Sequence, residues 1–321
     1  MSAQGPAAHA GAWDTYWRGT REHAAHREGG PQEPVLEAFW ATFFAAQLGA
    51  RATPSLLDLA CGHGAVTGHA LKVSPALLPH CSDYSFNALQ GLQQRYPSAR
   101  CIAADAGNTP FADGAFDLVV SQFGVEYAGP EALFEAARLV APGGTLGLLL
   151  HLAGGAIYRE CEHNRDTVRA LLELDILSLA RAAFDAGFAL NAGTGSPEVF
   201  KAAERASTPA VRGLEQLLQS RGAQSAGGLL QQLYQDIAHM YRRMSAYAPD
   251  DIRSWLDGMD LELTAYSGRM QSMLDAAFSQ QAIDAAMQRL AADGFSLRDL
   301  SRLRVSAEAQ PAAWALVMQR G

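Results

Sequence analysis

The sequence predicts an α/β protein with a doubly wound, seven-stranded, mostly parallel sheet and a helical segment inserted after the fifth strand. Three observations support this prediction. Short apolar runs alternate with helical stretches between Ser55 and His151, which is typical of right-handed βαβ units. A glycine-containing loop follows the first apolar run. After a long helical stretch, two strand-like segments return near the C-terminus, so the helical stretch interrupts one domain.

Composition indicates a globular protein, because 49% of the 321 residues are hydrophobic and 18% are charged. No apolar run approaches the roughly 20 residues of a membrane span, and no secretory signal is visible, so we expect a cytoplasmic protein without a membrane partner. The net charge of −8 argues against nucleic acid as a partner. The four cysteines form no Cys-x-x-Cys pair, so we expect reduced thiols and no metal site.

The first fifty residues are predicted to be helical. Trp13, Tyr16 and Trp17 recur at helical spacing, and an apolar helix is expected over 34–48. Two interpretations remain open for the aromatic cluster. It packs on the core as an anchor, or residues 1–50 form a helical lid over a ligand.

The strand predicted from Ser55 contains Leu56, Leu57 and Leu59, and its uninterrupted apolar character is typical of a buried parallel strand. Gly62 and Gly64 follow, and glycine permits a sharp turn and close approach of a ligand. A helix is expected from residue 65, with its free N–H groups directed at the loop.

The alternation then continues in order along the chain. The predicted elements are a strand over 76–82 ending at Asp83, a helix over 86–95, a strand over 100–104 ending at Asp105, a strand over 116–121, a helix over 131–140 and a strand over 145–151.

Residues 157–290 are predicted to be a helical insertion after the fifth strand. Helices are expected over 165–183, 211–218, 229–246, 251–278 and 282–290, and strands follow over 295–305 and 313–319. The core domain is therefore expected to comprise residues 51–156 and 291–321.

The run from Asp58 to Gly64, Asp-Leu-Ala-Cys-Gly-His-Gly, resembles the first motif of class I S-adenosylmethionine (SAM)-dependent methyltransferases. It departs at Ala60, where that family often has glycine. A dinucleotide-binding loop would need a small residue at Thr67, which disfavours a nicotinamide oxidoreductase. The strand ends at Asp83, at Asp105-Ala106 and at Ser121-Gln-Phe123, and the helix and turn over 135–144, also fit the family's order.

The resemblance implies a Rossmann-like methyltransferase fold that uses SAM and releases S-adenosylhomocysteine. An acid at the end of the second strand accepts the ribose hydroxyls, and the third strand end binds adenine. The implied cofactor-binding residues are Tyr16, Trp17, Asp58, Ala60, Cys61, Gly62, Gly64, Asp83, Tyr84, Asp105, Ala106, Gln122 and Phe123.

The implied reaction is in-line transfer of a methyl group to an O, N or C nucleophile of a small, partly hydrophobic molecule. In such methyltransferases an insertion after the fifth strand commonly covers the substrate, so the resemblance implies a helical substrate cap over residues 157–290. The candidate catalytic residues are His151, Glu126 and Tyr127, at the ends of the fourth and fifth strands; a purely structural role is open for each. The alternatives are a SAM-binding regulatory or assembly subunit without transfer activity, and a methyltransferase acting on a protein or peptide. We expect a monomer or a homodimer.

Overall fold

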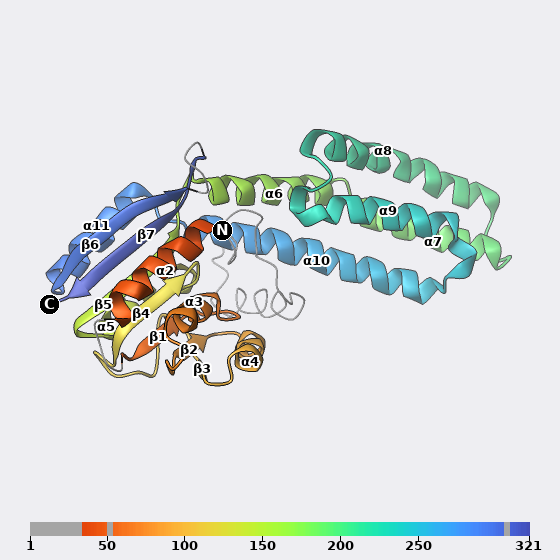
Figure 1. The fold of residues 1–321 in the computed structure, drawn as a ribbon. Helices are drawn as coiled ribbons and strands as arrows, with labels where there is room; N and C mark the ends of the chain where they lie inside the picture. The colour runs from red at the N-terminus through yellow and green to blue at the C-terminus, as the bar shows by residue number, and fades with distance from the viewer. Residues whose placement is uncertain (1–33, 50–53, 305–308) are drawn as a thin grey trace. The chain divides into compact units, whose positions relative to one another are not determined.

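The computed structural model describes residues 34–49, 54–304 and 309–321. These residues divide into two compact units. The first takes its described residues from 34–160 and 272–321, and the second spans Cys161–Gln271. Figure 1 shows the helices and strands of both units with their labels.

The first unit contains a seven-stranded sheet in the order β3-β2-β1-β4-β5-β7-β6. Its strands are β1 (Leu56–Leu59), β2 (His80–Asp83), β3 (Arg100–Ala103), β4 (Phe116–Gln122), β5 (Val140–His151), β6 (Phe295–Arg304) and β7 (Pro311–Arg320). β1 to β5 pair in parallel, whereas β7 is antiparallel to both β5 and β6. The predicted fold class, a doubly wound seven-stranded sheet, is confirmed.

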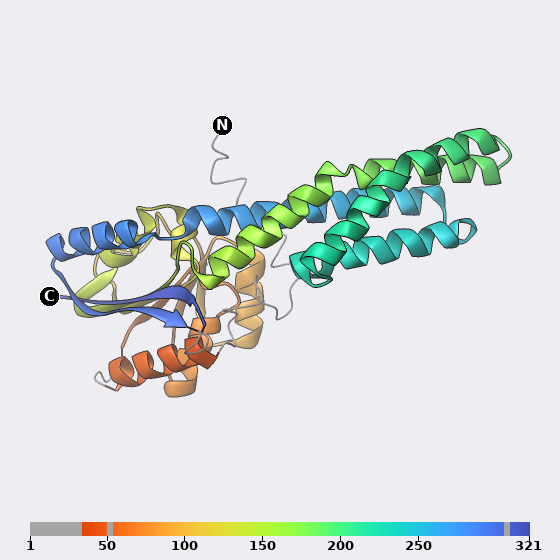
Figure 2. The same cartoon turned by 90° about the horizontal axis from the view of Figure 1, so that it is seen from above.

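Helices cover both faces of this sheet, which explains why β1 carries no exposed position. α2 (Pro34–Leu48) and α3 (Ala65–Val73) pack on one face, where Leu56, Leu118 and Val120 are buried. α5 (Ala132–Arg138) and α11 (Gln280–Ala292) pack on the other. Figure 2 shows α2 and α11 on opposite sides of β6 and β7.

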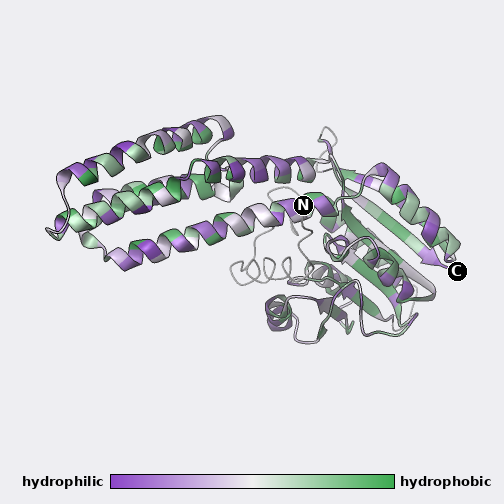
Figure 3. Ribbon diagram, turned by 180° about the vertical axis from the view of Figure 1, so that it is seen from behind, coloured by the Kyte–Doolittle hydropathy of each residue, from purple (hydrophilic) through white to green (hydrophobic). Residues whose placement is uncertain are grey.

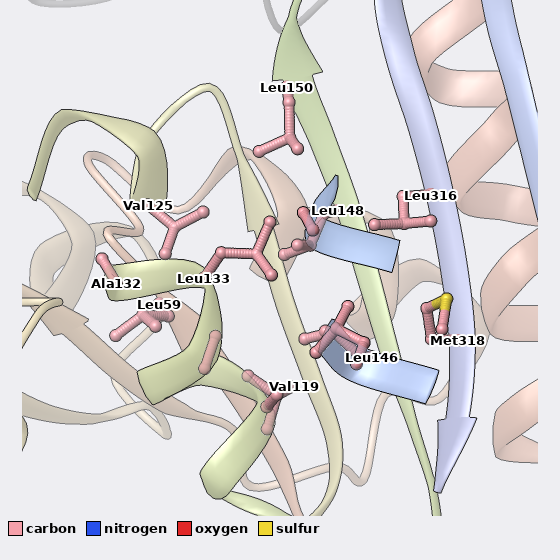
Figure 4. Packing of buried hydrophobic residues seen from close by; sticks show 14 of the residues in the cluster. Leu59, Val119, Val125, Ala132, Leu133, Leu146, Leu148, Leu150, Leu316 and Met318 are labelled. Carbon is pink, nitrogen blue, oxygen red and sulfur yellow. The ribbon is translucent and has the colours of Figure 1, made fainter. Parts of the chain in front are cut away.

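The core beneath α5 is built from alternate residues of neighbouring strands. Leu59, Val119 and Leu146 point from β1, β4 and β5 toward Leu133 of α5 (Figure 4). Because side chains alternate across a strand, this register leaves the intervening residues for the α2 face. The remaining helix of the strand-helix alternation, α4 (Phe86–Arg95), begins at Ser85, whose hydroxyl accepts a hydrogen bond from the Ala88 backbone N–H.

The second unit is helical. Its elements are α6 (Ala156–Glu173) and α10 (Pro249–Ala276), which begin or end in the first unit, and α7 (Ile176–Asn191), α8 (Pro197–Arg221) and α9 (Leu229–Arg242). Leu171, Ile176, Leu214, Leu230 and Leu263 belong to its core. In Figure 3 these helices alternate between hydrophobic and hydrophilic residues along their lengths, whereas the central strands of the sheet are mostly hydrophobic.

Two details differ from the predicted helical pattern. The helix expected over 165–183 is interrupted, because Asp175 has a left-handed backbone with φ of 53° between α6 and α7. α11 lies in the first unit, where Ile283, Ala286 and Leu290 pack into the core of the sheet. Their i, i+3, i+7 spacing gives α11 one apolar face, which the sheet buries. None of the helices in the described ranges is both long and apolar enough to cross a membrane.

Candidate functional site

The candidate site lies at the carboxyl edge of the sheet, where the strand order reverses. β1 has β2 on one side and β4 on the other, so the chain leaves β1 in one direction and returns for β4 in the other. Ligands of open α/β sheets bind at such a switch point. The residues that follow β1, β2, β3, β4 and β5 therefore build the site.

Asp58 fastens β1 to the first turn of α3. Its side chain is buried, and Oδ2 accepts hydrogen bonds from the Thr67 backbone N–H at 2.9 Å and from the Thr67 hydroxyl at 2.7 Å. Burial raises the pKa of Asp58 to about 7, against the lowering effect of these two bonds. Asp58 thus links the end of β1 to the start of α3, the two elements that the glycine loop connects.

Asp83 joins the glycine loop to the end of β2. Its Oδ2 accepts the Gly62 backbone N–H at 2.8 Å, and its Oδ1 accepts the Ser85 backbone N–H at 2.8 Å. Burial raises the pKa of the Asp83 carboxyl, and the backbone hydrogen bonds lower it. The residue stays partly exposed, so the carboxylate retains acceptor capacity toward a ligand.

The predicted loop glycine Gly64 has a packing role. It has φ of 79°, and a Cβ added there would lie 2.9 Å from the side chain of Leu92 in α4. The same Cβ would lie 3.2 Å from Tyr96, which directly follows α4. Close contact between the loop and α4 therefore accounts for this glycine. Cys61, in the same loop, is buried in the cluster beside α4.

Two non-glycine residues with left-handed backbone lie at the switch point. Ala60 after β1 has φ of 53°, and Phe123 after β4 has φ of 50°. The two loops are in close contact, because a Cβ on Gly124 would lie 2.7 Å from the Ala60 Cβ. Such strained backbone persists where the surrounding structure enforces it, and it is concentrated at functional sites.

Ala60→Gly should therefore stabilise the protein. Relief of the left-handed alanine exceeds the added entropy of glycine in the unfolded chain, so we expect a gain of about 0.5–1 kcal/mol in unfolding free energy. Urea denaturation measures it. Ala104→Gly, at a position without positive φ after β3, is the matched control and should destabilise the protein. A lower stability of Ala60→Gly would contradict this explanation of the loop.

The predicted adenine-binding residues lie along the ends of β2 and β3. Tyr84 is largely exposed. Asp105 is also exposed, and its Oδ1 accepts the Gly107 backbone N–H at 2.8 Å. Ala106 is buried. Tyr16 and Trp17, the two residues predicted for the lid, lie outside the described residues.

Gln122, the last residue of β4, has a partner that the sequence did not suggest. Its Oε1 accepts a hydrogen bond from Trp40 Nε1 at 2.6 Å. Trp40 is completely buried on α2, at helical spacing from Leu36 and Phe44. That spacing indicates a core position, and only the fold brings the indole N–H to the end of β4.

The predicted catalytic residues His151 and Glu126 form a buried pair. Oε1 of Glu126 lies 2.8 Å from Nδ1 of His151 and also accepts the His151 backbone N–H at 3.1 Å. Both side chains are almost completely buried. The ring centroid of His151 lies 4.6 Å from that of Phe123 and 5.6 Å from that of Tyr127. The fold thus assembles these four residues around one imidazole.

Among the residues that the structure describes, no group of three or more His, Cys, Asp or Glu side chains is placed to hold a metal ion. Carboxylates lie at the end of β2, in Asp83, and two residues after β3, in Asp105. Of the two, Asp83 is hydrogen-bonded to the loop at Gly62, whose backbone is left-handed.

Residues 57–148 match the family model of a methyltransferase domain. Over 113 residues the chain is 34% identical to a demethylmenaquinone methyltransferase of Beutenbergia cavernae, covering 35% of this chain and 46% of that protein. Over 122 residues it is 34% identical to a ubiquinone/menaquinone biosynthesis C-methyltransferase of Dinoroseobacter shibae, covering 36% and 49%. The chain thus spans about half the length of these two curated relatives.

A longer similarity extends over 205 residues. There the chain is 29% identical to a malonyl-[acyl-carrier protein] O-methyltransferase of Pseudescherichia vulneris, covering 58% of this chain and 81% of that protein. Among solved structures, a geranyl diphosphate C-methyltransferase of Streptomyces coelicolor A3(2) is similar at 18% identity and a TM-score of 0.35, covering 45% of this chain and 65% of that one.

Proposed function

We propose that the chain is an enzyme that methylates a small, partly hydrophobic molecule, on the premise that residues 57–148 are a class I SAM-dependent methyltransferase domain. The observation that supports this most directly is the agreement between the matched residues and the site. The match covers the strand ends and loops that meet at the switch point of the sheet, from Leu57 to Leu148. SAM is the cofactor of this domain.

In this proposal the ribose and the adenine of the cofactor are held by groups at the ends of β2 and β3. Asp83 would accept the ribose hydroxyls, and its hydrogen bond to the Gly62 N–H keeps the carboxylate beside the loop. Asp105 would accept the adenine amino group. When bound, SAM supplies a methyl group on a positively charged sulfur, so the protein mainly has to orient the nucleophile and exclude water.

The buried pair supplies a base with a defined orientation. Oε1 of Glu126 accepts the His151 backbone N–H, so this oxygen is an acceptor and Nδ1 of His151 carries the hydrogen that faces it. Nε2 is then the nitrogen that would take a proton from a substrate nucleophile; because this atom is buried, the side chains that cover it would have to move for a substrate to reach it. We propose this role for His151, with Glu126 as the residue that positions it.

The aromatic surroundings favour a hydrophobic substrate. The rings of Phe123 and Tyr127 contact His151 from residues that directly follow β4. An apolar, flat substrate would be in contact with the same rings beside the imidazole. Quinone-type molecules, which the names of two relatives include, belong to this class. The nucleophile that the substrate carries determines which atom, O, N or C, receives the methyl group.

Calorimetric titration with SAM and with NAD tests the proposed cofactor. We expect saturable binding of SAM and none of NAD. Transfer is tested separately, by incubating the protein and labelled SAM with small quinols and phenols and measuring labelled product. Binding of SAM without any methylated product over a broad substrate panel would favour a SAM-binding protein without transfer activity.

Asp83→Ala should weaken SAM binding by about 1.5–3 kcal/mol, because a hydrogen bond to a charged group is lost. The matched control is Asp117→Ala, since Asp117 also accepts a backbone N–H, from Ser55 at 2.9 Å, but lies at the start of β4. We expect the control to affect stability and leave the SAM dissociation constant unchanged. Circular dichroism establishes that both variants are folded. An unaltered dissociation constant in Asp83→Ala would exclude it from the cofactor site.

A further inference from the structure

The hydrogen bond between Trp40 and Gln122 fixes which way the Gln122 amide faces. An indole N–H donates and does not accept, so the atom 2.6 Å from Trp40 Nε1 is the amide oxygen. The two hydrogens on Nε2 therefore remain on the other side of the amide. Trp40 determines that Gln122 offers donors, and not acceptors, away from α2.

The Gln122 amide is more exposed than the residues that precede it on the same face of β4. Leu118 and Val120 precede Gln122 at alternate positions of β4, and both are completely buried beneath α2 and α3. Gln122 continues this row but is only partly buried. It is the last residue of β4, directly before Phe123, whose left-handed backbone turns the chain toward the β1 loop.

Trp40 is packed firmly enough to act as a support. It is completely buried, and its ring lies against Phe43 and Phe44 at centroid distances of 5.5 and 5.6 Å. A side chain held by several aromatic neighbours has little rotational freedom, so its N–H holds Gln122 in one rotamer at low entropic cost.

Gln122 and Asp83 lie on opposite sides of β1. β2 and β4 are the two neighbours of that strand, so their ends are about 10 Å apart, twice the spacing of adjacent strands. An extended ligand across the β1 loop would therefore meet a carboxylate at one end and an amide donor at the other. The acceptor-rich end of SAM is its amino-acid carboxylate.

We propose that Trp40 is a positioning residue for cofactor binding, which orients the Gln122 amide so that its NH2 group donates to the amino-acid carboxylate of the ligand. This inference rests on the proposed function, because it requires a SAM-type ligand. It assigns a role in affinity to a core tryptophan of α2 that does not itself contact the ligand.

The test compares two ligands that differ in the amino-acid part alone. S-adenosylhomocysteine and 5′-methylthioadenosine share the nucleoside and a neutral sulfur, but only the first has the carboxylate. Trp40→Phe keeps an aromatic ring and removes the donor. We expect the dissociation constant of S-adenosylhomocysteine to rise about tenfold, and that of methylthioadenosine to change less than about twofold. Calorimetry, with competition titrations for the weaker ligand, measures both.

Trp314→Phe is the matched control. Trp314 is also a buried tryptophan of the first unit, and its Nε1 donates to the Phe278 carbonyl at 2.9 Å. It lies on β7, paired with β5 near His151, and not on β1, β2 or β4, whose ends are assigned to the cofactor, so it is a control for cofactor binding and not for the transfer rate. Its replacement removes an equivalent hydrogen bond and should leave the ratio of the two dissociation constants as in the wild type.

Gln122→Glu is the second variant and does not disturb the α2 core. A glutamate still accepts the Trp40 N–H, but it places an oxygen where Nε2 was. S-adenosylhomocysteine should then bind about 10–100-fold more weakly, with a much smaller effect on methylthioadenosine. If Trp40→Phe does not fold, Gln122→Glu tests whether the Gln122 NH2 group donates to the amino-acid carboxylate of the ligand.

Equal weakening of both ligands by Trp40→Phe, or no weakening of either, would overturn the positioning role and leave the bond as a feature of packing. Unchanged S-adenosylhomocysteine binding in Gln122→Glu would overturn it as well. If the wild-type protein binds neither SAM nor S-adenosylhomocysteine, the proposed function itself fails. That outcome is distinct from a wild type that binds both and variants that do not discriminate.

Discussion

His151→Ala is expected to lower the methyl-transfer rate by about 10²–10⁴-fold, the usual effect of losing a general base, with little change in SAM affinity. The reason is the position of the imidazole, at the end of β5, in contact with the rings that follow β4. The residues proposed to hold the ribose and the adenine, Asp83 and Asp105, lie at the ends of β2 and β3, separated from β5 by β1 and β4.

The pH profile distinguishes a base from a packing residue. The wild-type rate should show an inflection that is absent in His151→Ala. Because the alanine variant leaves the buried Glu126 carboxylate without its imidazole partner, Glu126→Gln is the companion variant. Glutamine can still accept both His151 N–H groups through its amide oxygen, so the ring stays oriented while the negative charge is removed.

We expect Glu126→Gln to reduce the rate about tenfold, less than His151→Ala, and to retain the wild-type fold. The comparison uses a substrate whose nucleophile carries a proton. A transfer rate of His151→Ala equal to that of the wild type, with the same pH profile, would contradict the proposed base. His151 and Glu126 would then be a buried structural pair, and no base would be required.

The succession of strands and helices along the chain could be predicted, because each element depends on its local sequence pattern. The buried strands β1 and β4 contain short apolar runs, whereas β2 and β3 are shorter and less apolar; polar residues at or just after the strand ends, as at Asp83 and Asp105, help to place them. The return to strand pattern after the helical block predicts β6 and β7 but not their places in the sheet, where β7 lies between β5 and the edge strand β6. The match of residues 57–148 to the family model of a methyltransferase domain agrees with the motif at the first loop.

The features that escaped prediction depend on contacts between distant residues. Trp40 has the spacing of a core residue, and only the packing of α2 on the sheet brings its N–H to Gln122, 82 positions away. Gly64 is predicted as a loop position near a ligand, and the sequence does not indicate that a Cβ there would also meet Leu92 of α4. The break at Asp175 has no glycine or proline signal, because a non-glycine residue takes the left-handed conformation there.

Stability is expected to fall by roughly 4 kcal/mol as the pH rises from about 4 to 8 because of Asp58 alone. Burial raises the pKa of Asp58 to about 7, whereas its ordinary value is 3.8. Between these values the folded protein binds the proton and the unfolded chain does not, so rising pH favours unfolding. The stabilising contribution is complete below pH 4 and is lost as the pH passes through about 7.

Asp58→Asn isolates this contribution, because an amide is neutral throughout and its oxygen can still accept a hydrogen bond from Thr67. The measured quantity is the difference in unfolding free energy between wild type and variant, from urea denaturation at several pH values. Taking the difference cancels the other carboxyl groups, including Asp83, whose pKa burial also raises. The wild type should lose its advantage over the variant as the pH increases.

The matched control is Asp117→Asn. Asp117 accepts the backbone N–H and the hydroxyl of Ser55, both at 2.9 Å, so it has the same kinds of donor as Asp58 but is not buried. The control shows what altering such a pair of hydrogen bonds does without burial. A wild-type minus Asp58→Asn difference that stays constant from pH 4 to 8 would contradict a protonated Asp58 beneath the loop. A difference that declines toward pH 8 would mean that the anchor between β1 and α3 is strongest while Asp58 keeps its proton.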